Sequence, residues 1–222
     1  TPSQPPFDQN DATNAAHLDA GIYHWTPEIE NYGNVEQRLT FQLAGLDDLR
    51  TTNPVVREAL RAAYGQWIRD VGVDAFRIDT VKHVEHDFWH DFMHSTDPTT
   101  PGMHAVAAEV GRDDFFAFGE AFYGSEPFSD GGERIIQTYL GDEARPELSS
   151  VIHFPLYYTI SRVFAEGAPT AQMGYRLEAA AEIFPDPTLL PIFLDNHDVP
   201  RFLAAGTTDG LKQALTFLMT AP

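Results

Sequence analysis

Three acidic residues of this chain each end a short apolar run. Asp79 ends VDAFRID, Glu120 ends FFAFGE and Asp198 ends LPIFLDNHD. If these runs are parallel strands of one sheet, their carboxyl ends meet at one edge and bring the three acids together. Two carboxyl groups that hold opposite protonation states are what glycoside hydrolysis requires. The pattern therefore indicates cleavage of a glycosidic bond as the chemistry of these residues.

The neighbours of the first two acids favour opposite protonation states. Arg77 lies two residues before Asp79, on the same side of a strand, and its positive charge favours the ionised carboxylate. Glu120 follows the run FFAFG, and apolar surroundings favour the neutral acid. We expect Asp79 to be the nucleophile and Glu120 the acid and base. Asp198 is then expected to bind sugar hydroxyls and to support the cation-like transition state.

Helices and strands alternate after a loop-rich first stretch. Asn53 and Pro54 predict the start of a helix, and Gly72 predicts its end. The apolar face expected for this helix comprises Val56, Leu60, Ala63, Tyr64, Trp67 and Ile68. Strands are expected at 73–79, 115–120, 150–158 and 190–198. Further helices are expected through Phe88, Trp89, Phe92 and Met93, over 171–183 and over 211–219. This alternation is typical of a parallel sheet with both faces covered, as in a (β/α)8 barrel, whose active site lies at the carboxyl ends of the strands.

The motifs at these strand ends resemble those of the α-amylase family of glycoside hydrolases. FRIDTVKH (76–83) is similar to the family's strand-4 motif, GEAF (119–122) to its strand-5 motif and FLDNHDVPRF (193–202) to its strand-7 motif, in the family's order. LAGLDDL (43–49) is similar to the segment by which the family's inserted domain rejoins the barrel. The resemblance implies an α/β fold, an incomplete TIM (β/α)8 barrel with about strands 4 to 7 over residues 47–222. Residues 1–46 would be a partial, irregular inserted domain.

The same resemblance implies a retaining mechanism through a covalent glycosyl-enzyme on Asp79. The motif residues that would bind substrate, besides Asp198, are Arg77, Lys82, His83 and His197. Lys82 and His83 resemble a family pair that touches the sugar on the leaving side. This pair favours α-amylase or cyclomaltodextrinase over α-glucosidase. The implied bond is α-1,4-glucosidic, in starch, maltodextrin or cyclodextrin, and an α-glucan transglycosylase is the alternative.

Two departures from the family pattern concern calcium and the extent of the barrel. Gly45 stands where many relatives place an aspartate that binds calcium. A calcium ion held by the backbone carbonyl of His83 is the one cofactor that the resemblance implies, and no organic cofactor is expected. The strand-3 motif Asp-x-x-x-Asn-His and the strand-8 sequence of the family are not found in the chain. Both ends of the chain read as interior sequence, so we expect a fragment that is inactive and aggregates when isolated.

A row of histidines supports a second enzyme hypothesis. His86, His90 and His94 follow one another at helical spacing on one face. Paired histidines at this spacing bind zinc in HExxH enzymes, although the glutamate of that motif is missing. Three side chains spread over about 12 Å are too far apart for one ion. A surface row of histidines is therefore expected rather than a metal hydrolase.

A non-enzymatic relative is a further alternative, since some family members have lost their carboxylates. The chain keeps Asp79, Glu120, Asp198 and Arg77, and this favours an enzyme.

The composition excludes several kinds of partner. Thirty-three acidic residues against 14 basic ones give a formal charge of −19, which repels phosphate backbones and anionic membranes. We therefore expect no nucleic acid and no membrane among the partners, and an α-glucan as the substrate. Lysine occurs only at Lys82 and Lys212, a bias that fits either a salt-adapted host or skewed codon usage.

Redox compartment, localisation and oligomeric state stay open from the sequence. The chain has no cysteine, which excludes disulfides, and no apolar run approaches the ~20 residues of a membrane helix. The first residues, TPSQPPFDQNDATN, have neither the basic nor the apolar region of a signal peptide. An extracellular location fits a polymer substrate.

Overall fold

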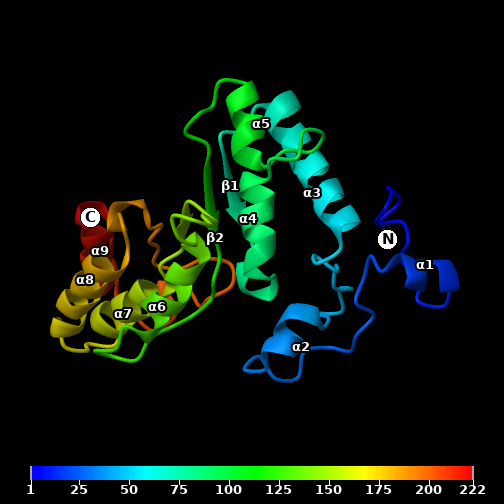
Figure 1. Ribbon diagram of the computed structural model, residues 1–222. Coiled ribbons are helices and arrows are strands. Elements are labelled where there is room, and N and C mark those ends of the chain that lie inside the picture. Colours follow the sequence, from blue (N-terminus) through cyan, green and yellow to red (C-terminus); the bar gives the residue numbers. More distant parts are fainter. Residues whose placement is uncertain (1, 222) are drawn as a thin grey trace. The chain divides into compact units, whose positions relative to one another are not determined.

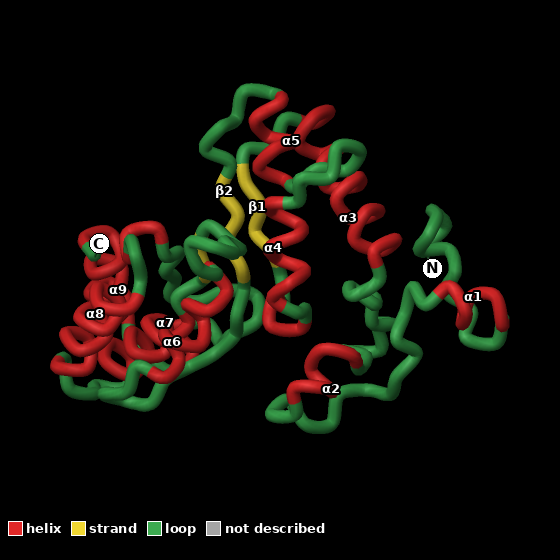
Figure 2. Tube along the Cα trace, viewed as in Figure 1, coloured by secondary structure: helices red, strands yellow, loops and turns green. Residues whose placement is uncertain are grey.

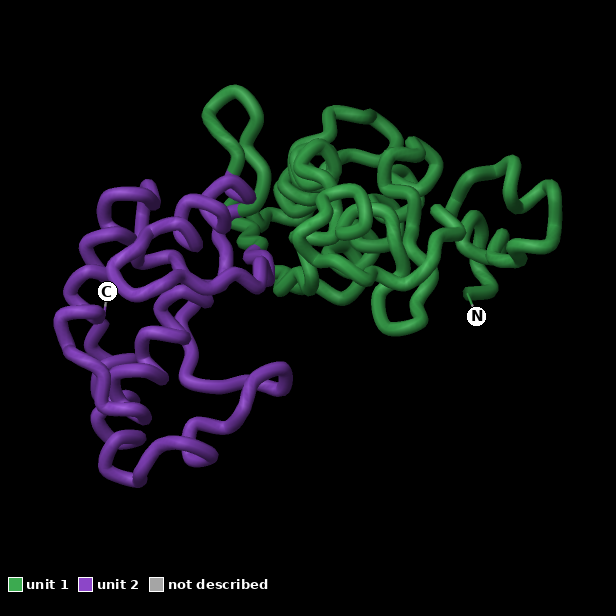
Figure 3. The backbone as a smooth tube through the Cα atoms, turned by 90° about the horizontal axis from the view of Figure 1, so that it is seen from below, with its two compact units in different colours: residues 1–117, 141–148 green, residues 118–140, 149–222 purple. Residues whose placement is uncertain are grey.

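The computed structural model describes residues 2–221, which fall into two compact units (Figure 3). The first unit comprises residues up to 117 together with 141–148, and the second comprises 118–140 together with the residues from 149 onward. Neither boundary lies near residue 46, so the division into an inserted domain over 1–46 and a barrel over 47–222 stays a prediction. Among the described residues, no helix is both long and apolar enough to cross a bilayer.

Helices make up most of the regular structure of the first unit, and α3, α4 and α5 pack pairwise against one another (Figure 1). Its elements are α1 (Ala15–Ala20), α2 (Val35–Thr40), α3 (Pro54–Gln66), a π-helical turn η1 (Trp67–Val71), β1 (Ala75–Ile78), a 3₁₀ turn η2 (Val81–His83), α4 (His86–His94) and α5 (Met103–Glu109). Residues 2–46 therefore contain only two short helices, as their loop-rich composition predicts.

The predicted start and end of α3 are confirmed. The Asn53 side chain accepts a hydrogen bond from the Val55 N–H at 2.9 Å, and Pro54 is the first helical residue. After η1 the chain ends the helical stretch at Gly72, whose φ of 78° is one that glycine adopts without a steric penalty. These signals are local, which is why the sequence alone reveals them.

The buried face of α3 differs from the predicted one. Val56 and Ile68 are buried, but Tyr64 and Trp67 are 46% and 56% exposed. Arg61 takes a buried place instead, because each of its three guanidinium nitrogens has a hydrogen-bond partner. It pairs with Asp91 and donates to the Thr100 carbonyl at 2.7 Å. An arginine whose guanidinium nitrogens have hydrogen-bond partners can be buried where an apolar side chain was expected.

The histidine row on α4 is not a bare surface row. The apolar face of α4 is buried as predicted, whereas the histidines hold residues 146 and 147 against the helix. His90 Nδ1 lies 2.7 Å from the Pro146 carbonyl oxygen, and His94 Nε2 lies 3.0 Å from the Glu147 carbonyl oxygen. His86 Nδ1 lies 2.9 Å from Glu147 Oε2, a contact that raises the pKa of His86. The row is therefore a docking face for residues 141–148.

The strands follow one another as β1–β2–β3 in one sheet, and β1 and β2 are visible side by side in Figure 2. β2 is Phe116–Gly119 and β3 is Ser150–Val151. They pair in parallel, with Phe118 opposite Ser150 and Gly119 opposite Val151. An α/β arrangement with parallel strands is thus confirmed.

Two strand predictions are wrong in extent. The strand expected over 150–158 stops at Val151, because α7 (Phe154–Ile160) begins three residues later. His153 caps that helix by accepting the Leu156 N–H, and Pro155 stands in its first turn. The strand expected over 190–198 is not formed. In this segment Pro191 makes one backbone hydrogen bond to the residues after β3: its carbonyl accepts the His153 N–H at 3.0 Å. A single bond of this kind does not make a β-ladder.

Helices also dominate the second unit. They are α6 (Gly131–Gln137), α7, a π-helical turn η4 (Ser161–Ala165), α8 (Ala171–Ile183) and α9 (Thr208–Thr220), with 3₁₀ turns at Thr138–Leu140, Pro187–Leu189 and Phe202–Ala204. The helix predicted over 171–183 is confirmed at both ends. Apolar side chains of α7, η4, α8 and α9 share a core with Leu194 and Phe202.

Candidate active site

The carboxyl end of β1 carries the first predicted pair. Asp79 follows the last residue of β1, and Arg77 Nη1 lies 2.7 Å from Asp79 Oδ1. Alternation along the strand puts both side chains on one face, as the two-residue spacing predicts. In this chain the two side chains are 34% and 62% exposed rather than buried. The ion pair is therefore accessible from outside.

Asp79 and Arg77 line a cavity of about 600 Å³ in the first unit. Apolar rings form much of its wall, including Tyr64 and Phe76, which meet edge to face at 5.7 Å. His83 also lines the cavity, whereas Lys82 is not among its lining residues. The structure thus brings three of the predicted site residues, Arg77, Asp79 and His83, to one hollow.

A strained turn directly after Asp79 brings His83 to this cavity. Thr80 has a φ of 49°, a left-handed conformation that is costly for a β-branched residue. The 3₁₀ turn η2 follows, and the Trp89 indole N–H donates to the Val81 carbonyl at 3.1 Å to fix it. His83 Nδ1 lies 3.0 Å from the Arg38 carbonyl oxygen, and burial lowers the pKa of His83. The ring is therefore held by the segment around α2.

Glu120 directly follows β2 and belongs to the second unit. It is 5% exposed, and Ala121 beside it is fully buried. The Gly119 carbonyl accepts the Ile152 N–H at 2.9 Å, which ties the backbone before Glu120 to the chain after β3. The predicted burial of Glu120 is present, and burial favours the neutral form of a carboxyl group.

His197 and Asp198 lie next to each other on a loop rather than at a strand end. His197 Nε2 is 3.0 Å from Asp198 Oδ2, and the two side chains are 73% and 42% exposed. The Asn196 side chain accepts the Asp198 N–H at 2.8 Å. The pair is preformed and open to solvent.

Asp195 and Arg201 brace this loop, a role that the sequence analysis missed. Asp195 accepts the Phe202 N–H at 2.9 Å and pairs with Arg201 Nη1 at 2.7 Å. These contacts, the Phe202 N–H first, lower the pKa of Asp195. The acid and the arginine stand six residues apart in FLDNHDVPRF, and this spacing was the available signal.

The seven predicted site residues are divided between the two units. Lys82 lies on η2 beside His83 but is not among the residues that line the cavity. Arg77, Asp79 and His83 gather in the first unit, and His197 pairs with Asp198 in the second. Glu120 is buried in the second unit. The convergence of Asp79, Glu120 and Asp198 at one site stays a prediction.

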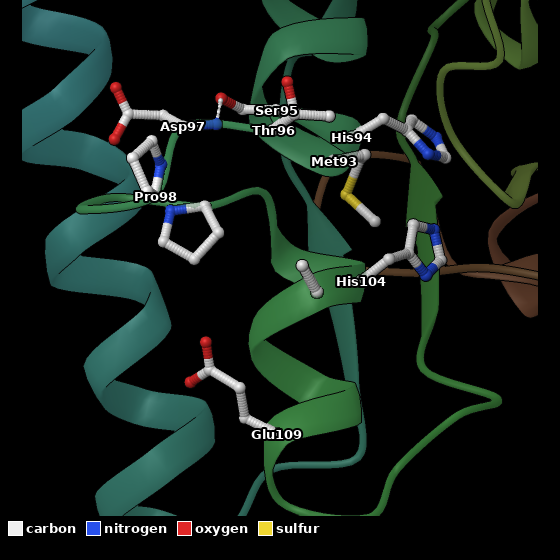
Figure 4. Close-up of a pocket in the computed structure, with 10 residues that line it drawn as sticks. Met93, His94, Ser95, Thr96, Asp97, Pro98, His104 and Glu109 are labelled. Carbon is white, nitrogen blue, oxygen red and sulfur yellow. Dashed lines mark hydrogen bonds between the residues drawn. The ribbon is translucent and has the colours of Figure 1, made fainter.

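A second cavity in the first unit holds none of the predicted site residues (Figure 4). Its volume is about 430 Å³, and its wall includes Asp97, whose N–H donates to Ser95 Oγ. The rings of His94 and His104 lie 4.8 Å apart along its edge. Between residues 2 and 221, no group of three or more His, Cys, Asp or Glu side chains could hold a metal ion. A zinc site on α4 therefore has no support.

The calcium ion expected at the His83 carbonyl stays a prediction that these side chains do not support. Gly45 contributes no carboxylate, and its N–H donates to Glu28 Oε1 at 2.5 Å. Calcium takes about six to eight oxygen ligands, and the described residues contain no cluster of three candidate side chains. No catalytic step is assigned to the ion.

Fold and local geometry together define a class: an α/β protein with acidic residues directly after parallel strands. The family model for the alpha-amylase catalytic domain matches residues 25–221, and the chain belongs to this family. Membership implies a TIM-barrel fold, and the described residues show a three-stranded sheet with helices.

Individual relatives agree with this family. The chain is 37% identical over 128 residues to an alpha-amylase of Streptomyces lividans, covering 55% of this chain and 12% of that protein. It is 30% identical over 193 residues to a cyclomaltodextrin glucanotransferase of Klebsiella oxytoca, covering 85% and 27%. The crystal structure of an Anoxybacillus alpha-amylase superposes with a TM-score of 0.73 at 27% identity, covering 92% and 42%. The chain thus spans less than half the length of each of these relatives.

Proposed function

We propose that the protein is a retaining glycoside hydrolase that cleaves α-1,4-glucosidic bonds in starch, maltodextrin or cyclodextrin. One observation carries the proposal: the Arg77–Asp79 ion pair at the end of β1, opening onto a cavity, in a chain of the alpha-amylase family. An ionised carboxylate held by a guanidinium is suited to attack an anomeric carbon.

In the first half of the proposed reaction, Asp79 forms a bond to the anomeric carbon as the bond to the leaving oxygen breaks. Glu120 gives its proton to that oxygen, so the leaving sugar departs as an alcohol and Glu120 becomes a carboxylate. The burial of Glu120 supports its starting role, because a buried carboxyl group favours the protonated form.

In the second half, a water molecule attacks the same carbon and the bond to Asp79 breaks. Glu120 takes the proton of that water and returns to its starting state. Two inversions leave the anomeric configuration unchanged. The proposed roles of His197 and Asp198 are to bind hydroxyls of the sugar being cleaved, and Lys82 and His83 would contact the sugar on the leaving side.

Transglycosylation is the second candidate, favoured by the likeness to the Klebsiella oxytoca cyclomaltodextrin glucanotransferase. It uses the same covalent intermediate, but a sugar hydroxyl replaces water in the second half. The product mixture separates the two: free reducing ends accumulate in hydrolysis, and cyclic or longer chains accumulate in transfer.

The test compares substitutions in the intact gene product. Glu120→Gln is expected to lower turnover of starch and cyclodextrin by about 10²–10⁴-fold, because the leaving oxygen loses its proton donor. Asp79→Asn is expected to abolish turnover. Glu166→Gln and Asp113→Asn, at exposed positions, are the matched controls and are expected to keep full activity. NMR of the first product should show the α anomer. Turnover at the wild-type rate in either site variant, or a β anomer, would contradict the proposal.

A further inference from the structure

A buried arginine on α8 holds the loop that follows Glu120. Arg176 is 1% exposed. Its Nη1 donates to the Ser129 carbonyl at 2.8 Å and its Nη2 to the Glu126 carbonyl at 3.0 Å. Both acceptors belong to residues 121–130, which we call the exit loop because the chain leaves β2 and Glu120 through it. Arg176 is therefore bonded to the main chain of the exit loop.

The charge of Arg176 is balanced inside the same unit. Glu133 on α6 is fully buried, and its Oε1 lies 2.5 Å from Arg176 Nη1. The other oxygen of Glu133 accepts the Ser125 hydroxyl at 2.9 Å, and this hydroxyl accepts the Gly132 N–H at 2.7 Å. Arg162 adds a bond to the Ser125 carbonyl at 3.0 Å. Three helical elements thus converge on the exit loop.

The exit loop contains a strained residue between the two carbonyls that Arg176 holds. Phe128 has a φ of 57°, a left-handed conformation that is rare outside glycine and asparagine. Such a conformation persists where the surroundings dictate it. The bonds to Glu126 and Ser129 on either side of Phe128 supply that constraint.

Close packing leaves the exit loop little freedom. A Cβ atom on Gly132 would lie 2.5 Å from the Gly124 carbonyl oxygen, and one on Gly124 would lie 3.0 Å from the Tyr158 ring. On the other side of Glu120, the Gly119 carbonyl is fixed by the Ile152 N–H. The backbone of Glu120 is consequently held between a β-ladder and an anchored loop.

A buried ion pair by itself is weak evidence of a stabilising role, because desolvation offsets its attraction. Here Nη1 and Nη2 of the arginine donate to two main-chain carbonyls of one loop, which specifies the conformation of that loop, and Nε donates to Thr159 Oγ1 on α7 at 3.2 Å. We propose that Arg176, balanced by Glu133, is a positioning residue that sets the placement of Glu120 through the exit loop. The inference rests on the proposed function, because it needs Glu120 to act as the acid.

The test is Arg176→Lys in the intact gene product. Lysine keeps the charge beside Glu133 but cannot bond Ser129 and Glu126 at once. With maltotriose, whose leaving sugar needs a proton, kcat is expected to fall at least about 10-fold with KM nearly unchanged. With α-glucosyl fluoride, whose fluoride needs little help from an acid, kcat/KM, which reports only the first half of the reaction, should fall less than about 3-fold. Arg145→Gln, at an exposed arginine that pairs with Asp87 outside the exit loop, is the control and should behave as wild type.

The double variant Arg176→Met with Glu133→Leu separates positioning from stability. It replaces the ion pair by apolar groups of similar volume, which is often neutral or stabilising. We expect a melting temperature at or above that of Arg176→Lys, together with the same selective loss on maltotriose. Equal losses on both substrates, or recovery of maltotriose turnover in the double variant, would overturn the positioning role. A wild-type protein that cleaves neither substrate would instead refute the proposed function, and the inference with it.

Discussion

At the scale of single residues, His153 shows how burial decides a protonation state. It caps α7 and is 2% exposed. Burial first, and then the charge of Arg176, lower the pKa of His153 to about 3. Its Nδ1 can accept the Leu156 N–H only while it carries no proton. The neutral imidazole is thus part of the first turn of α7.

This gives a pH prediction for His153→Asn. The folded pKa lies below the unfolded value of 6.5, so the unfolded chain binds the proton first as pH falls. The stability that neutral His153 contributes is complete above pH 6.5 and decreases towards pH 3, by about 1.4 kcal/mol per pH unit. Asparagine keeps a cap acceptor without titrating. In urea denaturation, the unfolding free energy of the wild type should therefore fall relative to that of the variant as the pH is lowered from 7 to 4.5.

The control for this experiment is His197→Asn, at a histidine that is 73% exposed. Its stability curve should run parallel to that of the wild type over the same pH range. If the His153→Asn curve also ran parallel, the buried imidazole would not be the source of the pH dependence.

At the scale of elements, Asn53 joins α3 to the segment before it. Its Oδ1 caps the helix, and its Nδ2 donates to the carbonyls of Ala20 and Gly21 at 3.1 and 3.0 Å. One side chain therefore satisfies a helix N-terminus and two carbonyl groups that lie more than thirty positions away in the sequence.

We predict that Asn53→Ala lowers the unfolding free energy by about 2 kcal/mol or more, since a lost cap costs about 0.5–2 kcal/mol and two further acceptors lose their donor. Asn53→Ser keeps a cap acceptor without placing a charge against the two carbonyl oxygens, so its loss should be smaller. Asn34→Ala removes the cap of the short, exposed α2 and is the matched comparison. Urea denaturation that ranks Asn34→Ala as the more damaging change would contradict this account.

At the scale of the whole molecule, the charge of −19 is the dominant property. Like charges repel most when the chain is compact, and salt shortens the range of that repulsion from about 30 Å at 0.01 M to about 10 Å at 0.1 M. Eight of the described ion pairs join arginine or lysine to an acid with both side chains at least partly exposed, and salt weakens these attractions as well. The excess of acids over bases means that repulsion should be the larger effect.

We therefore expect the melting temperature of the intact gene product to rise by several degrees between 0.01 and 0.2 M sodium chloride. Differential scanning fluorimetry measures this directly. The same range of sodium chloride at pH 4.5, where part of the carboxylates are protonated, should give a smaller rise. A melting temperature that falls with salt at pH 7 would show that the ion pairs outweigh the repulsion.

The sequence determined the features whose causes are local. Asn53 and Pro54 fix the start of α3, and the two-residue spacing of Arg77 and Asp79 puts them on one face of β1. Helix α8 has the predicted bounds. In each case the interacting groups lie within a few positions of one another, so the order of residues contains the information. The family membership follows from the same short motifs.

Only the tertiary structure decided which groups find distant partners. The expected strand over 190–198 lacks a ladder, Arg61 is buried through Thr100 and Asp91, and the α4 histidines hold residues 146 and 147. The burial of Arg176 and Glu133 likewise depends on contacts 43 positions apart. Backbone and charged groups can leave water only where a partner satisfies them, and that partner is chosen by the packing of the whole chain.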